Sequence, residues 1–262
     1  MSKTQIGLCK LCLRTRELQN SHLMPRALYK YVREPKKSKP DPILVSRTVT
    51  GRVSRQIKDY VLCKDCEDRF NRNGENYVLR QVWNGQTFPL RDRLTVAMER
   101  HTLSEALAYS GTDVGVDTDK LGYFALSVAW RAAVHTWKAQ FGESSTAVNL
   151  GQFQEPIRQY LLGVAAFPPG VNVVVHICSD RNSKECFYAP TPISGVPCTG
   201  FVMLALGIHF VVVIGSGVPR EICCVNSSHR LIFKRDCSQK LEEAFAQLIP
   251  NSRLTKGMAE DV

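Results

Sequence analysis

The chain has 262 residues, of which 44% are hydrophobic and 22% charged, and its formal net charge at pH 7 is +10. This is the composition of an ordinary globular protein, and the length favours two modest domains over one. The longest apolar run, at 200–215, is shorter than the ~20 residues of a membrane helix and contains glycine and His209, which excludes a transmembrane segment.

The excess positive charge lies at the start of the chain. Residues 1–60 hold 14 Lys or Arg and four Asp or Glu, whereas the other 202 residues hold 20 of each class. Such a concentrated basic region attracts phosphate polymers and anionic surfaces, because each neutralised phosphate releases a counterion. The first ten residues lack the apolar core of a signal peptide. A reducing compartment is therefore expected for the ten cysteines, and we expect the cytoplasm.

Residues 1–84 form the first expected domain, and its first feature is a Cys-x-x-Cys pair. Next come Ser21-His22-x-x-Pro25, a helix that begins near Pro25, and a charged loop at 33–41. The alternating, β-branched stretch at 43–62 predicts two strands that turn near Gly51. A second Cys-x-x-Cys pair follows, and then a helical pattern in which Asn73-Gly74 marks an interruption or a terminus.

The two cysteine pairs predict a structural zinc site. Each short pair directs two thiolates at one tetrahedral ion. A redox Cys-x-x-Cys pair is the alternative, but it would not need a second copy. The expected ligands are Cys9, Cys12, Cys63 and Cys66.

Residues 85–262 form the second expected domain, an α+β unit with two or more helices followed by a largely antiparallel sheet. Its predicted helices are a weak one at 103–110, a central buried one at 119–141, another at 153–167 and an amphipathic one at 238–249. Its predicted strands are at 171–178, 199–207, 209–215, 220–226 and 230–234. The six later cysteines are scattered among apolar stretches, where free cysteine behaves as a small hydrophobe.

The pattern C-x-x-C … SH-x-x-P … LC-x-x-C-E-x-x-x-N resembles the cysteine-bearing HNH endonucleases over about the first 80 residues. The resemblance implies a treble-clef zinc unit of ββα type that cleaves DNA with a divalent metal. Nucleases of this kind commonly serve in bacterial defence against phage, an analogy at family level only.

The resemblance also implies roles for individual residues. His22 matches the general base, and Ser21 occupies a place that is usually a metal ligand. Glu67 and Asn71 stand where the family carries metal-binding side chains, and their oxygens suit Mg²⁺ or Mn²⁺ better than zinc. The family's middle Asn, which steadies the base, is missing here or replaced by Asp59.

The chemistry supports His22 independently of the family. Phosphodiester hydrolysis needs an activated water, a cation at the scissile phosphate and positive charge along the backbone. A lone histidine would be an ordinary capping or core residue, but its place between two cysteine pairs and before Pro25 favours a catalytic role. The candidate phosphate contacts are Arg26, Lys30, Arg33, Lys36, Lys37, Lys39 and Arg69.

Two functions remain open at this point. One is an active, metal-dependent HNH-like nuclease acting on DNA, with RNA not excluded, whose second domain recognises the target or docks a protein partner. The other is a non-catalytic, zinc-finger-like binding or adaptor protein that uses the same basic region. His135 and Arg131 are expected to make core or interface hydrogen bonds, and Trp130 and Trp137 to lie in the core. No Walker loop, Gly-x-Gly-x-x-Gly or Gly-x-Ser-x-Gly is present.

Overall fold

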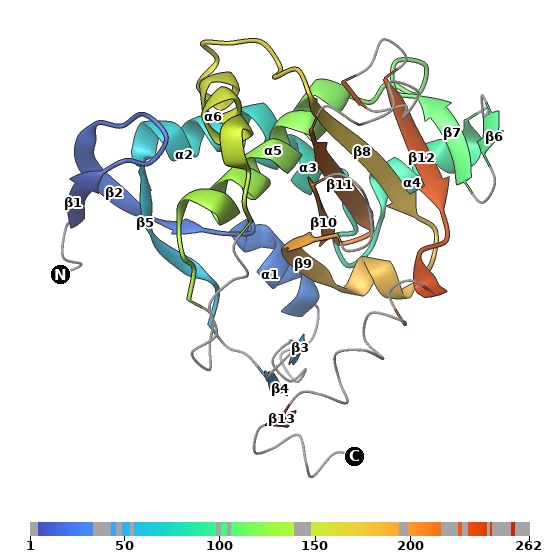
Figure 1. Cartoon of the computed structure of the whole chain (residues 1–262). Helices are drawn as coiled ribbons and strands as arrows, with labels where there is room; N and C mark the ends of the chain where they lie inside the picture. The colour runs from blue at the N-terminus through green and yellow to red at the C-terminus, as the bar shows by residue number, and fades with distance from the viewer. Residues whose placement is uncertain are drawn as a thin grey trace.

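The computed structural model describes residues 5–33, 43–45, 49–52, 55–97, 101–103, 106–138, 148–193, 199–215, 225–226, 230–239, 242 and 253–254. Over these residues the fold is α+β, as predicted, and its strands form three sheets. A small N-terminal sheet and a large sheet lie on opposite sides of a central helix, α5 (Figure 1).

The N-terminal sheet consists of β1 (Gln5–Leu8), β2 (Thr15–His22) and β5 (Lys58–Cys63), all antiparallel in the order β1-β2-β5. Helix α1 (Arg26–Arg33) follows β2, which confirms the helix predicted after Pro25. Helix α2 (Lys64–Phe70) follows β5 directly and brings the second cysteine pair beside the sheet.

The helical segment that begins at α2 does not end at Asn73-Gly74. It continues through a π-helical turn, η1 (Asn71–Glu75), into α3 (Asn76–Leu79). The predicted interruption is therefore a change of helical pitch. Gly74 is needed for packing, because a Cβ there would lie 2.9 Å from the backbone nitrogen of Phe124 in α5.

The predicted turn at Gly51 is wrong. Strands β3 (Ile43–Val45) and β4 (Val49–Arg52) do pair in antiparallel fashion, but Gly51 lies inside β4 opposite Leu44. Strand β13 (Arg253–Leu254) runs parallel to β4 and completes this sheet. The last part of the predicted stretch is β5, which pairs with β2 because Val61 and Leu62 are buried in the core.

The large sheet has the strand order β6-β7-β12-β8-β11-β10-β9, and every neighbouring pair is antiparallel except β12 and β8. Its strands are β6 (His101–Leu103), β7 (Ala106–Ser110), β8 (Val171–Cys178), β9 (Phe187–Pro192), β10 (Thr199–Ala205), β11 (Ile208–Ile214) and β12 (Leu231–Arg235). The largely antiparallel sheet is thus confirmed. Of the strand predicted at 220–226 only 225–226 are described, and they form a turn; most of the helix predicted at 238–249 also lies outside the described residues.

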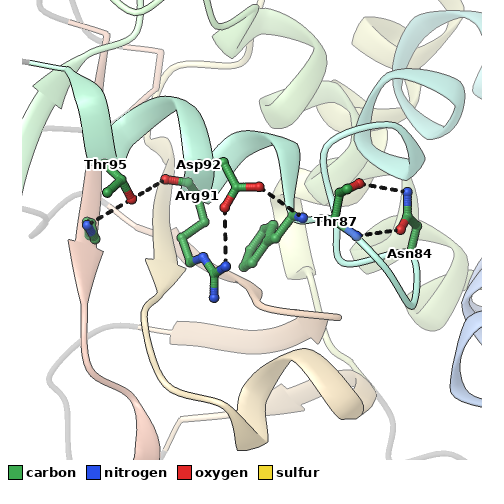
Figure 2. Close-up of polar contacts among 7 residues, drawn as sticks. Asn84, Thr87, Arg91, Asp92 and Thr95 are labelled. Atoms are coloured by element: carbon green, nitrogen blue, oxygen red, sulfur yellow. Dashed lines mark hydrogen bonds and ion pairs between the residues drawn. The ribbon is translucent and has the colours of Figure 1, made fainter.

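The helix predicted at 103–110 is wrong, because Ala106–Ser110 is strand β7, paired along its length with β12. A helix that the sequence analysis missed, α4 (Pro89–Val96), lies earlier. Figure 2 shows how its start is fixed: Asn84 Oδ1 accepts from the backbone nitrogen of Thr87 at 2.9 Å, and Asp92 Oδ2 accepts from that of Phe88 at 3.4 Å. Proline at the first helical position was the available signal.

Helix α5 (Thr118–Val134) is the buried central helix that the sequence predicted. Asp117 caps it by accepting from the backbone nitrogen of Lys120 at 3.0 Å. It ends at Val134 and not at 141, because His135 has extended backbone angles (φ −148°, ψ 140°). A 3₁₀ turn, η3 (Gly151–Phe153), leads into α6 (Gln154–Leu162), which packs against α5 and confirms the predicted helix there.

One hydrophobic core spans both sides of the predicted domain boundary at residue 84. The ring of Phe70 in α2 meets that of Trp130 in α5 at 6.3 Å, and Phe124 in α5 meets Phe210 in β11 at 5.3 Å. Trp130 and Trp137 are both buried, as predicted. The division into 1–84 and 85–262 stays a prediction. No helix in the described ranges combines the length and hydropathy that crossing a bilayer requires.

Candidate functional site

The four predicted zinc ligands come together at one end of the N-terminal sheet. Cys9 and Cys12 lie in the loop between β1 and β2, Cys63 ends β5, and Cys66 lies in the first turn of α2. Their sulfur atoms all lie within 4.8 Å of one another, and Cys12 and Cys63 are 3.9 Å apart. Two sulfurs on one tetrahedral zinc ion stand about 3.8 Å apart. The cluster therefore has the dimensions of a site that could hold a metal such as zinc.

The local backbone prepares these thiols for a cation. The loop closes through Leu13, whose φ of 56° permits a tight turn, and the Leu13 nitrogen donates to the carbonyl of Cys9. Cys9 Sγ accepts from the backbone nitrogen of Cys63 at 3.3 Å. A side-chain hydrogen bond from Cys66 is the largest cause that lowers the pKa of Cys9 to about 4, and it raises the pKa of Cys66. These contacts favour the thiolate form of Cys9, which is the form that binds metal.

The first cysteine loop is also held by the second half of the chain. Arg158 of α6 donates from Nη1 to the carbonyl oxygen of Leu11 at 2.6 Å, and Glu155 binds the other side of its guanidinium at 2.6–2.7 Å. Leu11, between the two cysteines, is fully buried. The first cysteine loop is therefore tied to α6 as well as to the small sheet.

His22, the predicted base, is the last residue of β2 and is partly buried. Its Nε2 lies 2.7 Å from Oε1 of Gln56. Because an amide oxygen only accepts, Nε2 carries the proton and Nδ1 keeps a lone pair. Burial lowers the pKa of His22, and the positive charges of Lys58 and Arg26 lower it further, so the ring is neutral at pH 7.

Sequence reasoning missed Gln56. The backbone around it is fixed, because the nitrogen of Leu23 donates to the carbonyl of Ile57, and the nitrogen of Ile57 donates to the hydroxyl of Tyr29. A side-chain amide just before β5 was the available signal. Asp59, the predicted substitute for the missing Asn, instead contacts Nε2 of His135 at 2.9 Å. The amide beside His22 is thus Gln56.

Glu67 and Asn71, the other predicted catalytic residues, lie one turn apart along α2 and η1. The hydroxyl of Ser21, next to His22, donates to the carbonyl of Gln19 at 3.4 Å, accepts from the backbone nitrogen of Leu62 at 3.2 Å and lies close to Glu67. Burial raises the pKa of Glu67. Its Oε1 is buried and finds no hydrogen-bond partner among the described residues. The structure therefore places Glu67 next to the end of β2. The role of Asn71 beside it stays a prediction.

Arg131 is a buried cation of this region and is only 1% exposed. From α5 it donates to Glu75 Oε1 at 2.5 Å and to the carbonyl oxygen of His22 at 2.8 Å, and it lies 5.4 Å from the ring centre of Phe70. Its charge also acts to lower the pKa of Glu67. The predicted core role of Arg131 is confirmed, and this residue fixes the backbone that carries the candidate base.

The predicted phosphate contacts that the structure describes lie in two places, on α1 and at the end of α2. Arg26 and Lys30 are exposed and lie one turn apart on α1, and Arg26 is close enough to act on His22. Arg69 lies beside the end of α6, where its Nη1 would be 3.3 Å from a Cβ at Gly163. Arg33 ends α1, while Lys36, Lys37 and Lys39 lie outside the described residues. Lys58, which was not predicted, joins Arg26 near His22.

Replacing Glu75 by Ala should destabilise the chain strongly. The substitution leaves Arg131 as an uncompensated charge in the core, and breaking a buried pair costs about 3–5 kcal/mol. Thermal or urea unfolding of the full chain measures the loss. Asp68→Ala is the matched control on α2, because its 2.7 Å pair with Lys64 is exposed and its removal should hardly move the midpoint. Equal unfolding midpoints for Glu75→Ala and Asp68→Ala would show that the buried Arg131–Glu75 pair does not stabilise the fold.

Comparison with known proteins finds no matching family model, no similar curated protein and no similar solved structure.

Proposed function

We propose that the chain is an HNH-like endonuclease that hydrolyses phosphodiester bonds in DNA, with residues 1–84 as its zinc-stabilised catalytic unit. The observation that carries the proposal is the 2.7 Å contact between Nε2 of His22 and Oε1 of Gln56. It leaves Nδ1 of a neutral imidazole as a proton acceptor in a partly exposed position. A general base for water needs this protonation state and this access.

The order of elements supports the same function. The first cysteine pair lies between β1 and β2, the second lies at the start of α2, and β2, β5 and α2 are neighbours. A strand hairpin between two cysteine pairs, with a helix after the second, is what a treble-clef unit of ββα type requires. In this interpretation the zinc is structural and joins β2 to β5 at the end opposite His22, because Cys63 pairs with Leu18 and Lys58 pairs with His22.

The catalytic steps fall to a few side chains. His22 accepts the proton of the attacking water at Nδ1, and Gln56 keeps the ring in that orientation. Arg26 and Lys58 bring positive charge to the DNA backbone. Glu67, whose buried Oε1 has no described partner, would hold Mg²⁺ or Mn²⁺ together with Asn71. When bound, such a cation supplies positive charge at the scissile phosphate.

One observation favours a second function, nucleic-acid binding without catalysis. Arg131 already supplies a fixed cation in this region, through its buried bond to Glu75 and its effect on the pKa of Glu67. Carboxylates that a guanidinium neutralises do not require a divalent ion. In this alternative the zinc unit only presents its basic residues to nucleic acid.

A cleavage assay with the wild-type chain separates the two functions. Supercoiled plasmid, single-stranded DNA and RNA are each incubated with zinc-loaded protein plus Mg²⁺ or Mn²⁺, and with a weak chelator that spares the zinc. The nuclease proposal expects nicking that needs the added ion. If none of these substrates is cut with either ion while DNA still binds, the binding module is the function.

DNA binding should weaken steeply as salt rises, because released counterions supply much of its free energy. Arg26→Glu should lower the affinity and reduce the slope of log affinity against log salt by about one. Fluorescence anisotropy with a labelled duplex measures both. Arg181→Glu is the matched control, because it makes the same charge change at an exposed position of the second half of the chain. A salt-independent affinity, or equal losses in the two variants, would contradict the assignment.

A further inference from the structure

Two of the scattered cysteines meet at the end of the large sheet. Cys178 is the last residue of β8, and Cys237 lies two residues after the end of β12. The two strands run parallel, with Arg235 in register with Cys178, so their ends emerge side by side. The sulfur atoms of Cys178 and Cys237 are 2.8 Å apart. They belong to neither the predicted zinc cluster nor the proposed catalytic unit.

The backbone on both sides of the pair is fixed. The nitrogen of Ser179 donates to the carbonyl of Arg235 at 2.9 Å, which joins the two strand ends. The nitrogen of Cys237 donates to Oδ2 of Asp180 at 3.0 Å. The thiols therefore face each other in the folded chain without any rearrangement of the strands.

A metal site explains this pair poorly. Its sulfur separation of 2.8 Å is shorter than the about 3.8 Å between two thiolates on one zinc ion, whereas the N-terminal cluster matches that value. The only carboxylate in the group, Asp180, already accepts from the nitrogen of Ser183 at Oδ1 and from the Ser183 hydroxyl and Cys237 at Oδ2. Two sulfurs are thus left, and structural zinc takes four ligands.

We propose that Cys178 and Cys237 form a reversible disulfide when the chain meets a low-molecular-weight disulfide such as oxidised glutathione. Cys237 is the attacking thiolate, because it is partly exposed while Cys178 is fully buried. A hydrogen bond from Cys178 lowers the pKa of Cys237, and the charge of Arg235 lowers it further. The geometry and the accessibility of the two thiols thus give them different roles.

The exchange balances in two steps. The Cys237 thiolate attacks one sulfur of the glutathione disulfide, forms a mixed disulfide and releases one glutathione thiolate. Cys178 then gives up its proton and displaces the second glutathione from Cys237. The two cysteines lose two electrons in total, and the glutathione disulfide leaves as two thiols.

The bond would close the chain between residues 178 and 237 and tie the segment after β12 to β8. Cross-linking a loop of this length restricts the unfolded chain, so the midpoint of thermal unfolding should rise by about 5–10 °C. Cys186 provides an internal control. Its sulfur faces backbone carbonyls, those of Asn182 at 3.6 Å and Ser183 at 3.9 Å, and contacts no thiol of the described cysteines.

The test is oxidation of the full-length, zinc-loaded chain with oxidised glutathione, followed by peptide mapping by mass spectrometry. We expect a Cys178–Cys237 cross-link that dithiothreitol removes, together with the rise in midpoint. Cys178→Ser should trap glutathione on Cys237 and show no rise, and Cys237→Ser should take up no glutathione at Cys178. Cys186→Ser should oxidise like the wild type.

Three results would overturn the proposal. The first is a wild-type chain that forms no cross-link at equilibrium with the oxidant. The second is a cross-link that joins Cys186 to either partner. The third is a second zinc ion per chain that Cys237→Ser removes, since the pair would then be metal ligands.

Discussion

Purified protein should carry about one zinc ion per chain, and Cys63→Ser should lose it together with the structure of the N-terminal sheet. The four sulfurs lie within 4.8 Å of one another. The core of this small sheet cannot replace the stability that a metal ion bound to them supplies. Structural zinc contributes about 10–16 kcal/mol in small zinc domains, as much as or more than the 5–15 kcal/mol net stability of a typical protein. Metal analysis and circular dichroism measure the two losses.

The loss should extend beyond the small sheet. Arg158 of α6 holds the carbonyl of Leu11 in the first cysteine loop, and Phe70 of α2 packs on Trp130 of α5. Cys186→Ser is the control, because this cysteine lies far from the cluster in the chain and has no thiol partner at bonding distance in the described residues. It should keep both zinc and stability. A Cys63→Ser chain with wild-type zinc content and an unchanged unfolding midpoint would refute the four-cysteine site.

The parts of this molecule that the sequence predicted well depend on short-range patterns. Two Cys-x-x-Cys pairs predict a metal cluster because each pair brings its own two thiols together within one turn. The apolar pattern of 119–141 predicts a buried helix whatever surrounds it, and α5 forms over Thr118–Val134. Strands β8, β10, β11 and β12 followed from β-branched stretches that glycine and proline separate, whereas β9 was not predicted.

The rest depended on partners that are distant in the chain. Arg131 meets the carbonyl of His22 across 109 positions, and Gln56 meets the ring across 34. The stretch 106–110 has a helical composition, yet it pairs with β12 more than a hundred residues later, and this pairing overrides a weak local preference. Cys178 and Cys237 are 59 positions apart. No local pattern contains such contacts, because tertiary packing creates them.

His22→Ala should reduce DNA cleavage by about 10²–10⁴-fold, the usual cost of losing a general base. Zinc content and DNA affinity should stay near those of the wild type, because the imidazole contacts Gln56 and none of the four cysteines. Gln56→Ala should cause a smaller loss, since the ring keeps its lone pair but loses its fixed orientation. Single-turnover rates on a supercoiled plasmid measure the three proteins.

The same assay also separates the roles of the carboxylate and the guanidinium. If Glu67 holds the catalytic cation, Glu67→Ala should slow cleavage, and a higher Mg²⁺ or Mn²⁺ concentration should restore part of the rate. Asn71→Ala should slow cleavage less, because a neutral amide binds a hard cation less tightly than a carboxylate. Asp65→Ala is the control, since that exposed carboxylate on the same helix pairs with Arg16. Cleavage that survives His22→Ala would place the active site elsewhere in the chain. A Glu67→Ala rate that no ion restores would mean that Arg131 and the carboxylates form a purely structural group.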